Sequence, residues 1–537
     1  MNSKFNTLSV RGQWKALVLS SVLTLVASSA FASVNVNNGN FYVAYTDFLV
    51  PTPGLNIEIT RTYNSRSNYA KGFFGPGWSS DLDSYLSFEG KMVSYHEGGG
   101  GNLARFAPKG KIWENGVFGY QTIEKSKNGY VLHTTFAKDL FFDAKGKLER
   151  IADRNKNGID LIYKDGLISM LKDNFNNQIK VKWGEFGGAP RIVLLEMGDK
   201  KSRYEYSRAG DLVRASGMDA VPYEYAYDDQ HNMSKIVYQN GQTKEMAYNK
   251  ARDWITRFKD RDGVTNAYDY YADKLDPENK FGTTLVRTRE GSQERDASKY
   301  WYEFRRRADG SRYNYRAVTW IRGVATETIF TECCGTPQVV SQWNSEEPKS
   351  SDAAQQWTVA ATDKKSTFFE YYSDGLLKKK TLPDGAITEL TYDAKHKKVA
   401  SVVREGRKLE YTYDDRGNLA WAFDAQTNRR IDLTYDLKGR ITVIQERTNG
   451  PKAQTKLVYF RYNASGKPVE IKEKAGAFTG SIRVSYTPSG EVSGILNAQG
   501  RVVASEKEVE SVRRVASTFQ NLLELVQPAG VSLTPEG

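Results

Sequence analysis

Two adjacent cysteines are the residues of this chain with the most distinctive chemistry. Cys333 and Cys334 are the only cysteines in the sequence. An ordinary disulfide needs Cα atoms about 4.4–6.8 Å apart, whereas neighbouring residues lie about 3.8 Å apart across a trans peptide. A vicinal disulfide here would therefore be a strained ring that fixes a tight turn. The alternatives are two buried free thiols, or a ring whose flat face contacts a ligand such as a sugar. No histidine or second cysteine pair stands at zinc-site spacing.

A second candidate site begins at Asp153. The segment 153–158 reads Asp-Arg-Asn-Lys-Asn-Gly and matches the first half of a calcium-binding loop. The twelfth position of such a loop should be a bidentate Glu, but here it is Lys164. Asp160 could contribute only to an irregular site. The same residues suit a hairpin turn rich in Asn and Gly, which is the favoured interpretation, so the sequence predicts neither a metal nor a cofactor.

Signals for catalysis are weak. None of the four histidines (His96, His133, His231 and His396) stands in an H-E-x-x-H pattern or beside a nucleophile motif. The chain has no G-x-S-x-G segment and no P-loop. Many carboxylates follow a tyrosine, where local backbone bonding explains them. The sequence therefore predicts a protein that is not an enzyme.

Tryptophans suggest a carbohydrate-binding surface. Trp301, Trp320, Trp343 and Trp357 cluster in one stretch of the chain. Indole rings can stack on sugars if they are exposed, but aromatic residues on strands more often pack in the core. Both interpretations remain open from the sequence.

The elements that must position these residues are predicted by an internal repeat. A tyrosine is followed by Asp or Asn, a short polar stretch and Gly, as in Tyr413-Asp414 with Gly417 and Tyr435-Asp436 with Gly439. The acidic side chain can bond its own backbone and start a turn, and glycine supplies a positive φ. Apolar and polar residues alternate between these turns, which predicts strands with one buried face. Recurrence at about 20 residues predicts an all-β array of stacked hairpins that needs caps at its ends.

The first 32 residues predict export. Lys4, Arg11 and Lys15 precede an apolar run over 16–27, and Ala30-Phe31-Ala32 supplies a small-x-small cleavage pattern. The run is too short to span a membrane as an ordinary helix, and no cysteine near Ala32 allows lipidation. Removing the leader lowers the formal net charge from +12 to +9. This charge favours weak contact with anionic envelope polymers, not nucleic-acid binding. We expect a secreted, periplasmic or cell-surface protein without a transmembrane segment.

The repeat resembles the YD-repeat of bacterial RHS proteins over roughly residues 35–503. The segment after the leader resembles the entrance to such arrays, through Arg61, Tyr63 and Asn64 and through Gly75-Pro76-Gly77-Trp78. The resemblance implies a long sheet of hairpins wound in a spiral around a hollow interior, as a partial or complete shell. RHS toxins carry a self-cleavage motif with Asp-Pro before a C-terminal toxin. The only Asp-Pro here is Asp276-Pro277 in mid-chain, so we expect no self-cleaving toxin.

The predicted organisation has six parts. They are the signal peptide (1–32), the entrance region (33–140), a repeat array (141–272), an irregular insert with the tryptophans and cysteines (273–365), a second array (366–503) and a C-terminal tail (504–537). The tail begins with a capping-box pattern at 505–508 and continues with apolar residues at helical spacing. We expect one amphipathic helix that caps the open end of the shell or docks on a partner.

Three functions fit these observations. The first is a non-enzymatic shell that acts as a scaffold or as a surface-interaction protein. The second is an adhesin-like module that binds an envelope glycan, and the third is a container for a separately encoded toxin or cargo. Fold alone does not choose among them.

Overall fold

The fold is almost entirely β-structure. The computed structural model describes residues 31–52, 54–67, 72–115, 122–134, 138–308, 310–332, 335–348, 363–448, 454–463, 466–476, 478–486, 492–497 and 500–501. These residues form forty strands and one short 3-10 turn, η1 (Asp81–Asp83). The expected all-β class is confirmed. The predicted C-terminal helix and most of the predicted signal peptide lie outside the described residues, as do Cys333, Cys334 and Trp357.

The first four strands form an antiparallel sheet of their own, here called the inner sheet. Its order is β1-β2-β3-β4. Its members are β1 (Phe31–Asn35), β2 (Asn40–Val50), β3 (Ile57–Asn64) and β4 (Trp78–Ser80).

The remaining strands form one long antiparallel sheet, here called the wound sheet. Each strand pairs with the next in chain order from β5 to β40. The first part comprises β5 (Tyr85–Glu89), β6 (Met92–His96), β7 (Leu103–Lys109), β8 (Ile112–Glu114), β9 (Thr122–Lys125), β10 (Gly129–His133), β11 (Lys138–Asp143), β12 (Leu148–Asp153), β13 (Gly158–Lys164), β14 (Leu167–Asp173), β15 (Gln178–Phe186), β16 (Ala189–Met197), β17 (Lys200–Tyr206), β18 (Leu212–Ser216), β19 (Pro222–Tyr227), β20 (Met233–Tyr238), β21 (Thr243–Asn249), β22 (Trp254–Lys259) and β23 (Val264–Ala272).

The second part continues without a break in pairing. It comprises β24 (Lys280–Arg289), β25 (Arg295–Arg306), β26 (Arg312–Ile321), β27 (Val324–Phe330), β28 (Pro337–Asn344), β29 (Lys365–Tyr371), β30 (Leu377–Thr381), β31 (Ile387–Tyr392), β32 (Val399–Arg404), β33 (Arg407–Tyr413), β34 (Leu419–Asp424), β35 (Arg429–Tyr435), β36 (Ile441–Thr448), β37 (Gln454–Tyr462), β38 (Pro468–Ala475), β39 (Phe478–Tyr486) and β40 (Val492–Asn497). The insert expected at 273–365 therefore breaks the sequence period but not the sheet, because β24 to β28 pair within the same ladder. In this stretch β24, β25 and β26 are long, with 10 to 12 residues each.

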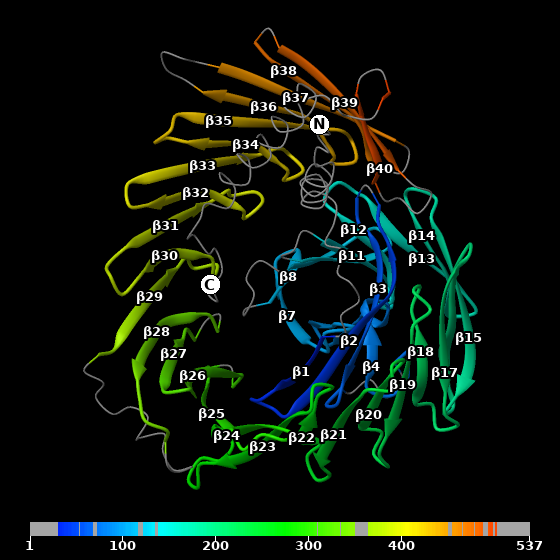
Figure 1. The fold of residues 1–537 in the computed structure, drawn as a ribbon, viewed down its shortest axis with the longest axis vertical. Helices are drawn as coiled ribbons and strands as arrows, with labels where there is room; N and C mark the ends of the chain where they lie inside the picture. The colour runs from blue at the N-terminus through cyan, green and yellow to red at the C-terminus, as the bar shows by residue number, and fades with distance from the viewer. Residues whose placement is uncertain are drawn as a thin grey trace, which may run out of the picture.

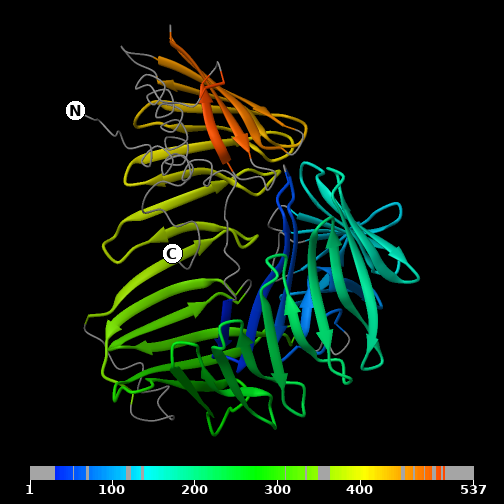
Figure 2. The ribbon, with the colours of Figure 1, turned by 45° about the vertical axis from the view of Figure 1, so that its right-hand side comes forward.

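The wound sheet curves around the inner sheet. In Figure 1 it runs down one side, along the bottom, up the opposite side and across the top, and β1 to β4 lie inside this ring together with β7 and β8 of its first part. Figure 2 shows the inner strands against the wall that contains β17 to β20. Among the described strands no pairing joins β40 to β5, so the sheet keeps two edges. One isolated bridge, between Tyr85 and Lys147, folds β5 back beside the turn between β11 and β12.

Each repeat turn is built by the residues of the Tyr-Asp pattern. Asp414 accepts the backbone N–H groups of Arg416 at 2.9 Å and Asn418 at 2.8 Å through Oδ1. Gly417 has φ +81°, a region in which L side chains are strained. The turn after Tyr435 has the same design, with Asp436 bonding its own backbone and Gly439 at φ +78°.

The tyrosine of each repeat ties its strand to the preceding strand. Tyr413 donates its hydroxyl hydrogen bond to the carbonyl of Val399 at 2.7 Å, and Tyr435 donates to that of Leu419 at 2.8 Å. A register shift directly precedes both tyrosines, and such a bulge re-aims the side chain. The same bond joins Tyr163 to Leu148, Tyr206 to Ile192, Tyr227 to Leu212, Tyr248 to Met233, Tyr270 to Ile255, Tyr392 to Leu377, Tyr462 to Ile441 and Tyr486 to Pro468.

Candidate functional site

A buried ion pair within the inner sheet is hydrogen-bonded to the wall. Arg61 on β3 donates from Nε to Asp47 Oδ2 on β2 at 2.5 Å, and the two side chains are 0% and 3% exposed. Two wall residues complete the site: Tyr204 on β17 donates to Asp47 Oδ2 at 3.0 Å, and Tyr225 on β19 accepts from Arg61 at 3.0 Å. Burial raises the pKa of Asp47, while the charge of Arg61 opposes that rise.

The rest of the entrance motif packs around this pair. The guanidinium of Arg61 lies 4.5 Å from the ring centre of Trp78, and Trp78 Nε1 donates to Tyr227 at 2.8 Å. Tyr63 accepts the backbone N–H of Met233 at 2.8 Å. The entrance residues are therefore an anchor between the two sheets.

The glycines of that motif allow close approach. A Cβ on Gly77 would lie 2.5 Å from the ring of Tyr63, and one on Gly75 would lie 2.8 Å from the carbonyl oxygen of Gly210. Pro76 stands between them in the tight turn, and the backbone N–H of Asn64 donates to the carbonyl of Gly77 at 2.9 Å.

A seam joins the first repeat array to the second. It is formed by the turn 153–158, between β12 and β13, and by turns of the second array. Asn155 exchanges side-chain amide bonds of 3.2 Å with Asn418, and Asn157 donates to the carbonyl of Lys438 at 3.0 Å. The Nζ of Lys438 lies 4.3 Å from the ring centre of Phe175. The two arrays of the wound sheet therefore contact each other here through the side chains of their turns and not through strand pairing.

The segment 153–158, which matches the first half of a calcium-binding loop, forms one of the turns of the seam. Asp153 accepts both the backbone and the side-chain N–H of Asn157, at 2.9 and 2.8 Å. Asp160 forms an ion pair with Arg150. Within the described ranges no group of three His, Cys, Asp or Glu side chains could hold a metal ion. The segment is a hairpin turn whose Asn side chains serve the seam.

The structure brings together one pair that the sequence analysis missed. Ser87 Oγ lies 2.9 Å from His96 Nε2 across the β5–β6 hairpin, and the ring of Tyr85 stacks on His96 at 4.2 Å. A serine nucleophile also needs donors for an oxyanion. The backbone N–H groups of Gly98 and Gly99, which follow His96 in the chain, already donate to the hydroxyls of Ser84 and Ser79. Predicting this contact requires the register of the β5–β6 hairpin, which the sequence did not define.

The other histidines serve as polar partners. His133 contacts Asp139 at 2.8 Å and Glu124 at 3.3 Å, and the hydrogen bond to Asp139 is the main reason that its pKa is raised. His231 contacts Asp211 at 2.6 Å. His396 lies at the seam, where its carbonyl accepts from Arg154 at 3.5 Å.

Three of the tryptophans that the sequence left open as a sugar platform or as core residues lie in the core. Trp301, Trp320 and Trp343 are 1%, 8% and 7% exposed and form one buried cluster with Val318 and Ala325. Trp320 Nε1 donates to the carbonyl of Ser345 at 2.9 Å. These three rings therefore pack in the core and present no face to a ligand.

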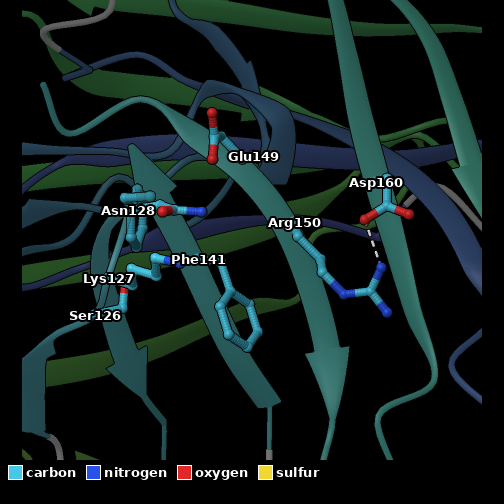
Figure 3. A pocket seen from close by; sticks show the side chains of 8 residues that line it. Ser126, Lys127, Asn128, Phe141, Glu149, Arg150 and Asp160 are labelled. Atoms are coloured by element: carbon cyan, nitrogen blue, oxygen red, sulfur yellow. Dashed lines mark hydrogen bonds and ion pairs between the residues drawn. The ribbon is translucent and has the colours of Figure 1, made fainter. Parts of the chain in front are cut away.

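A shallow pocket of about 340 Å³ lies on the wall near β11 to β13. Figure 3 shows the side chain of Arg150 directed at Asp160 across it, with Lys127, Phe141 and Glu149 on the rim. Its two cations and two carboxylates balance each other, so it offers no strong charge to a ligand. No helix among the residues that the structure describes is both long and apolar enough to cross a membrane.

Comparisons with known proteins give a partial match. A family model described as a domain of unknown function (DUF6531) matches residues 32–106, a segment that contains the entrance motif. No curated protein matches the chain. Among solved structures, TcdB2-TccC3-Cdc42 aligns with a TM-score of 0.44 and 12% identity, over 85% of this chain and 24% of that one. TcdB2-TccC3 without its hypervariable C-terminal region aligns at 0.44 and 9%, over 94% and 29%. The Photorhabdus luminescens Tc holotoxin pore aligns at 0.35 and 10%, over 87% and 29%. This chain thus covers between 24% and 29% of the length of these three solved chains.

Proposed function

We propose that this chain is an exported, non-enzymatic scaffold or surface-interaction protein of the RHS/YD-repeat type. The observation that carries the proposal is the course of the wound sheet, which surrounds the inner sheet and returns to meet itself at the seam. The inner sheet is anchored to the wall by hydrogen bonds that Tyr204 and Tyr225 make to a buried ion pair. A large continuous wall of this kind is suited to presenting surfaces to partners.

Export is tested by fractionating cells that produce the full chain. We expect the protein outside the cytoplasm with a mature N-terminus near Ser33, as read by N-terminal sequencing. A chain that stays in the cytoplasm with residues 1–32 intact would overturn the export part of the proposal.

The non-enzymatic part is tested at the serine–histidine pair of Ser87 and His96. The mature protein is incubated with a fluorophosphonate probe, beside a Ser87→Ala variant. We expect no labelling of either protein, because the backbone N–H groups of Gly98 and Gly99, which follow His96 in the chain, already donate to Ser84 and Ser79. Labelling that disappears in Ser87→Ala would assign a serine-type activity to this hairpin and refute the proposal.

A further inference from the structure

One end of the β25–β26 hairpin carries a column of aromatic rings with an arginine on it. Phe281 on β24 and Phe304 on β25 are stacked, with ring centres 5.4 Å apart and planes 14° apart. The guanidinium carbon of Arg312 on β26 lies 3.9 Å from the centre of the Phe304 ring. Tyr302 extends the column at 5.9 Å from Phe281. The N–H groups of a guanidinium lie in its own plane, so a guanidinium that contacts a ring can still donate from its edge to a planar anion.

Arg306 stands directly across the sheet from Arg312. The two residues are register partners in the β25–β26 ladder, and both side chains are exposed. Like charges directly opposite one another destabilise a sheet. The charge of Arg306 is, after burial, the main factor that lowers the pKa of Arg312. The arrangement therefore carries a repulsion that an anion would relieve.

No internal acid pairs with these two arginines in the described part of the chain. Within the described residues, the side chain of Arg306 donates to the carbonyl of Gly310 at 3.2 Å. Asp276 and Glu278, on the preceding turn, act on Arg312 only at a distance and form no ion pair with it. The same hairpin treats its buried arginine differently, because Arg316 pairs with Glu303 at 2.6 Å and Glu327 at 2.7 Å. Among the described residues, therefore, acids pair with Arg316 but not with Arg306 or Arg312.

Two more arginines lie at the same hairpin end. Arg305 lies over the ring of Tyr315 at 3.2 Å, and Arg307 lies over that of Tyr313 at 4.9 Å. Four arginines therefore fall within residues 305–312, and ring stacking restrains three of them. Arg312 shares the sheet face of its register partner Arg306, whereas Arg305 projects from the opposite face. A cation held on a ring, as Arg312 is, loses less conformational freedom when it binds an anion.

We propose that this hairpin end, here called the arginine hairpin, binds a carboxylate-bearing polysaccharide. Arg306 and Arg312 would receive a carboxylate, since the guanidinium fork matches that group in two-point hydrogen bonds. The partly exposed rings of Phe281 and Phe304 would border the sugar. The cations are confined to one hairpin end and do not line a groove that could follow a nucleic-acid backbone, so a glycan is favoured over single-stranded nucleic acid. The inference goes beyond the scaffold function and does not depend on it.

The test measures binding of the mature protein to polygalacturonate by calorimetry, with its fully methyl-esterified form as the ligand control. Arg306→Gln and Arg312→Gln should each weaken binding on the order of tenfold, since each removes charge-assisted hydrogen bonds. The matched control is Arg322→Gln, which removes an exposed arginine at the other end of β26, where Arg322 pairs with Asp296 at 2.9 Å. Arg322→Gln should bind as the parent does.

Thermal unfolding separates loss of binding from loss of fold. Removing one member of the repelling pair should leave the melting temperature equal to or above that of the parent. Equal binding of the methyl ester, or unchanged binding by Arg306→Gln and Arg312→Gln, would overturn the inference. Binding to a single-stranded oligonucleotide or to anionic lipid vesicles without binding to polygalacturonate would also overturn it. A failure here would leave the fractionation and probe tests of the scaffold proposal unaffected.

Discussion

Asn155 and Asn418 lie 263 residues apart in the sequence and exchange two side-chain amide hydrogen bonds of 3.2 Å. Each residue belongs to a repeat turn, one in the first array and one in the second. Because the seam rests on turn side chains, it can be weakened without breaking any strand ladder. Substitutions at the seam therefore test how much the contact between the two repeat arrays contributes to the stability of the fold.

Gly439→Ala should destabilise the protein more than a comparable change outside the seam. Gly439 has φ +78°, and a Cβ there would lie 2.3 Å from Asn155 Nδ2. The matched control is Gly406→Ala, because Gly406 has φ +79° with nothing within 4 Å of its Cβ position. Both changes should cost about 1–2 kcal/mol for the backbone conformation, and Gly439→Ala should cost more through the seam. Urea unfolding midpoints measure the difference, and equal midpoints would show that the seam contributes nothing.

Arg61→Met should be strongly destabilising, because it leaves the carboxylate of Asp47 buried without its partner. Breaking a buried pair in this way costs about 3–5 kcal/mol. The double change Arg61→Met with Asp47→Asn should recover part of this loss, since no buried charge then remains. Lys250→Met is the exposed control, because Lys250 and Asp229 form a pair that is 65% and 72% exposed, and it should not change the denaturant midpoint. A mild effect of Arg61→Met would contradict the anchor.

The contribution of Asp83 to the free energy of unfolding should decrease as the pH rises from 4 to 6. Burial raises the pKa of Asp83 from 3.8 to about 6. The folded state therefore binds a proton that the unfolded state releases, and this stability is present below pH 4 and lost as the pH passes the folded pKa. A shift of this size corresponds to roughly 3 kcal/mol. Asp83→Asn should remove this contribution, so its unfolding free energy should change less between pH 4 and 6. Parallel profiles for the two proteins would refute the assignment.

Tyr413→Phe should lose about 1 kcal/mol of stability, the usual net value of one hydrogen bond. The change removes the bond from the Tyr413 hydroxyl to the carbonyl of Val399, at 2.7 Å, and keeps the ring. Tyr459→Phe is the control, because Tyr459 is 40% exposed. Its hydroxyl is not one of those that donate to the carbonyl of the preceding strand. If the two changes have equal effects in urea unfolding, the tyrosine ladder has no role in stability.

The sequence by itself determined the local structure of this protein. The turn chemistry of Tyr413, Asp414 and Gly417 involves residues within a few positions of one another, together with the strand just before them. Alternation of apolar and polar residues determined which strand face is buried, as in β2, where buried and partly buried residues alternate. Such features depend on short-range sterics and hydrogen bonding, which a sequence records directly.

Only the tertiary structure decided which distant residues meet. The sequence interpretation of 153–158 as a turn named the right local structure, yet nothing in it indicated that Asn155 would reach Asn418. The tryptophans Trp301, Trp320 and Trp343 could be assigned to core or surface only when the strand faces were known. Arg306 and Arg312 became a pair through the register of one hairpin. Side-chain proximity across a wound sheet depends on register, twist and the path of the chain, and these are set by the packing of the whole fold rather than by any local pattern of residues.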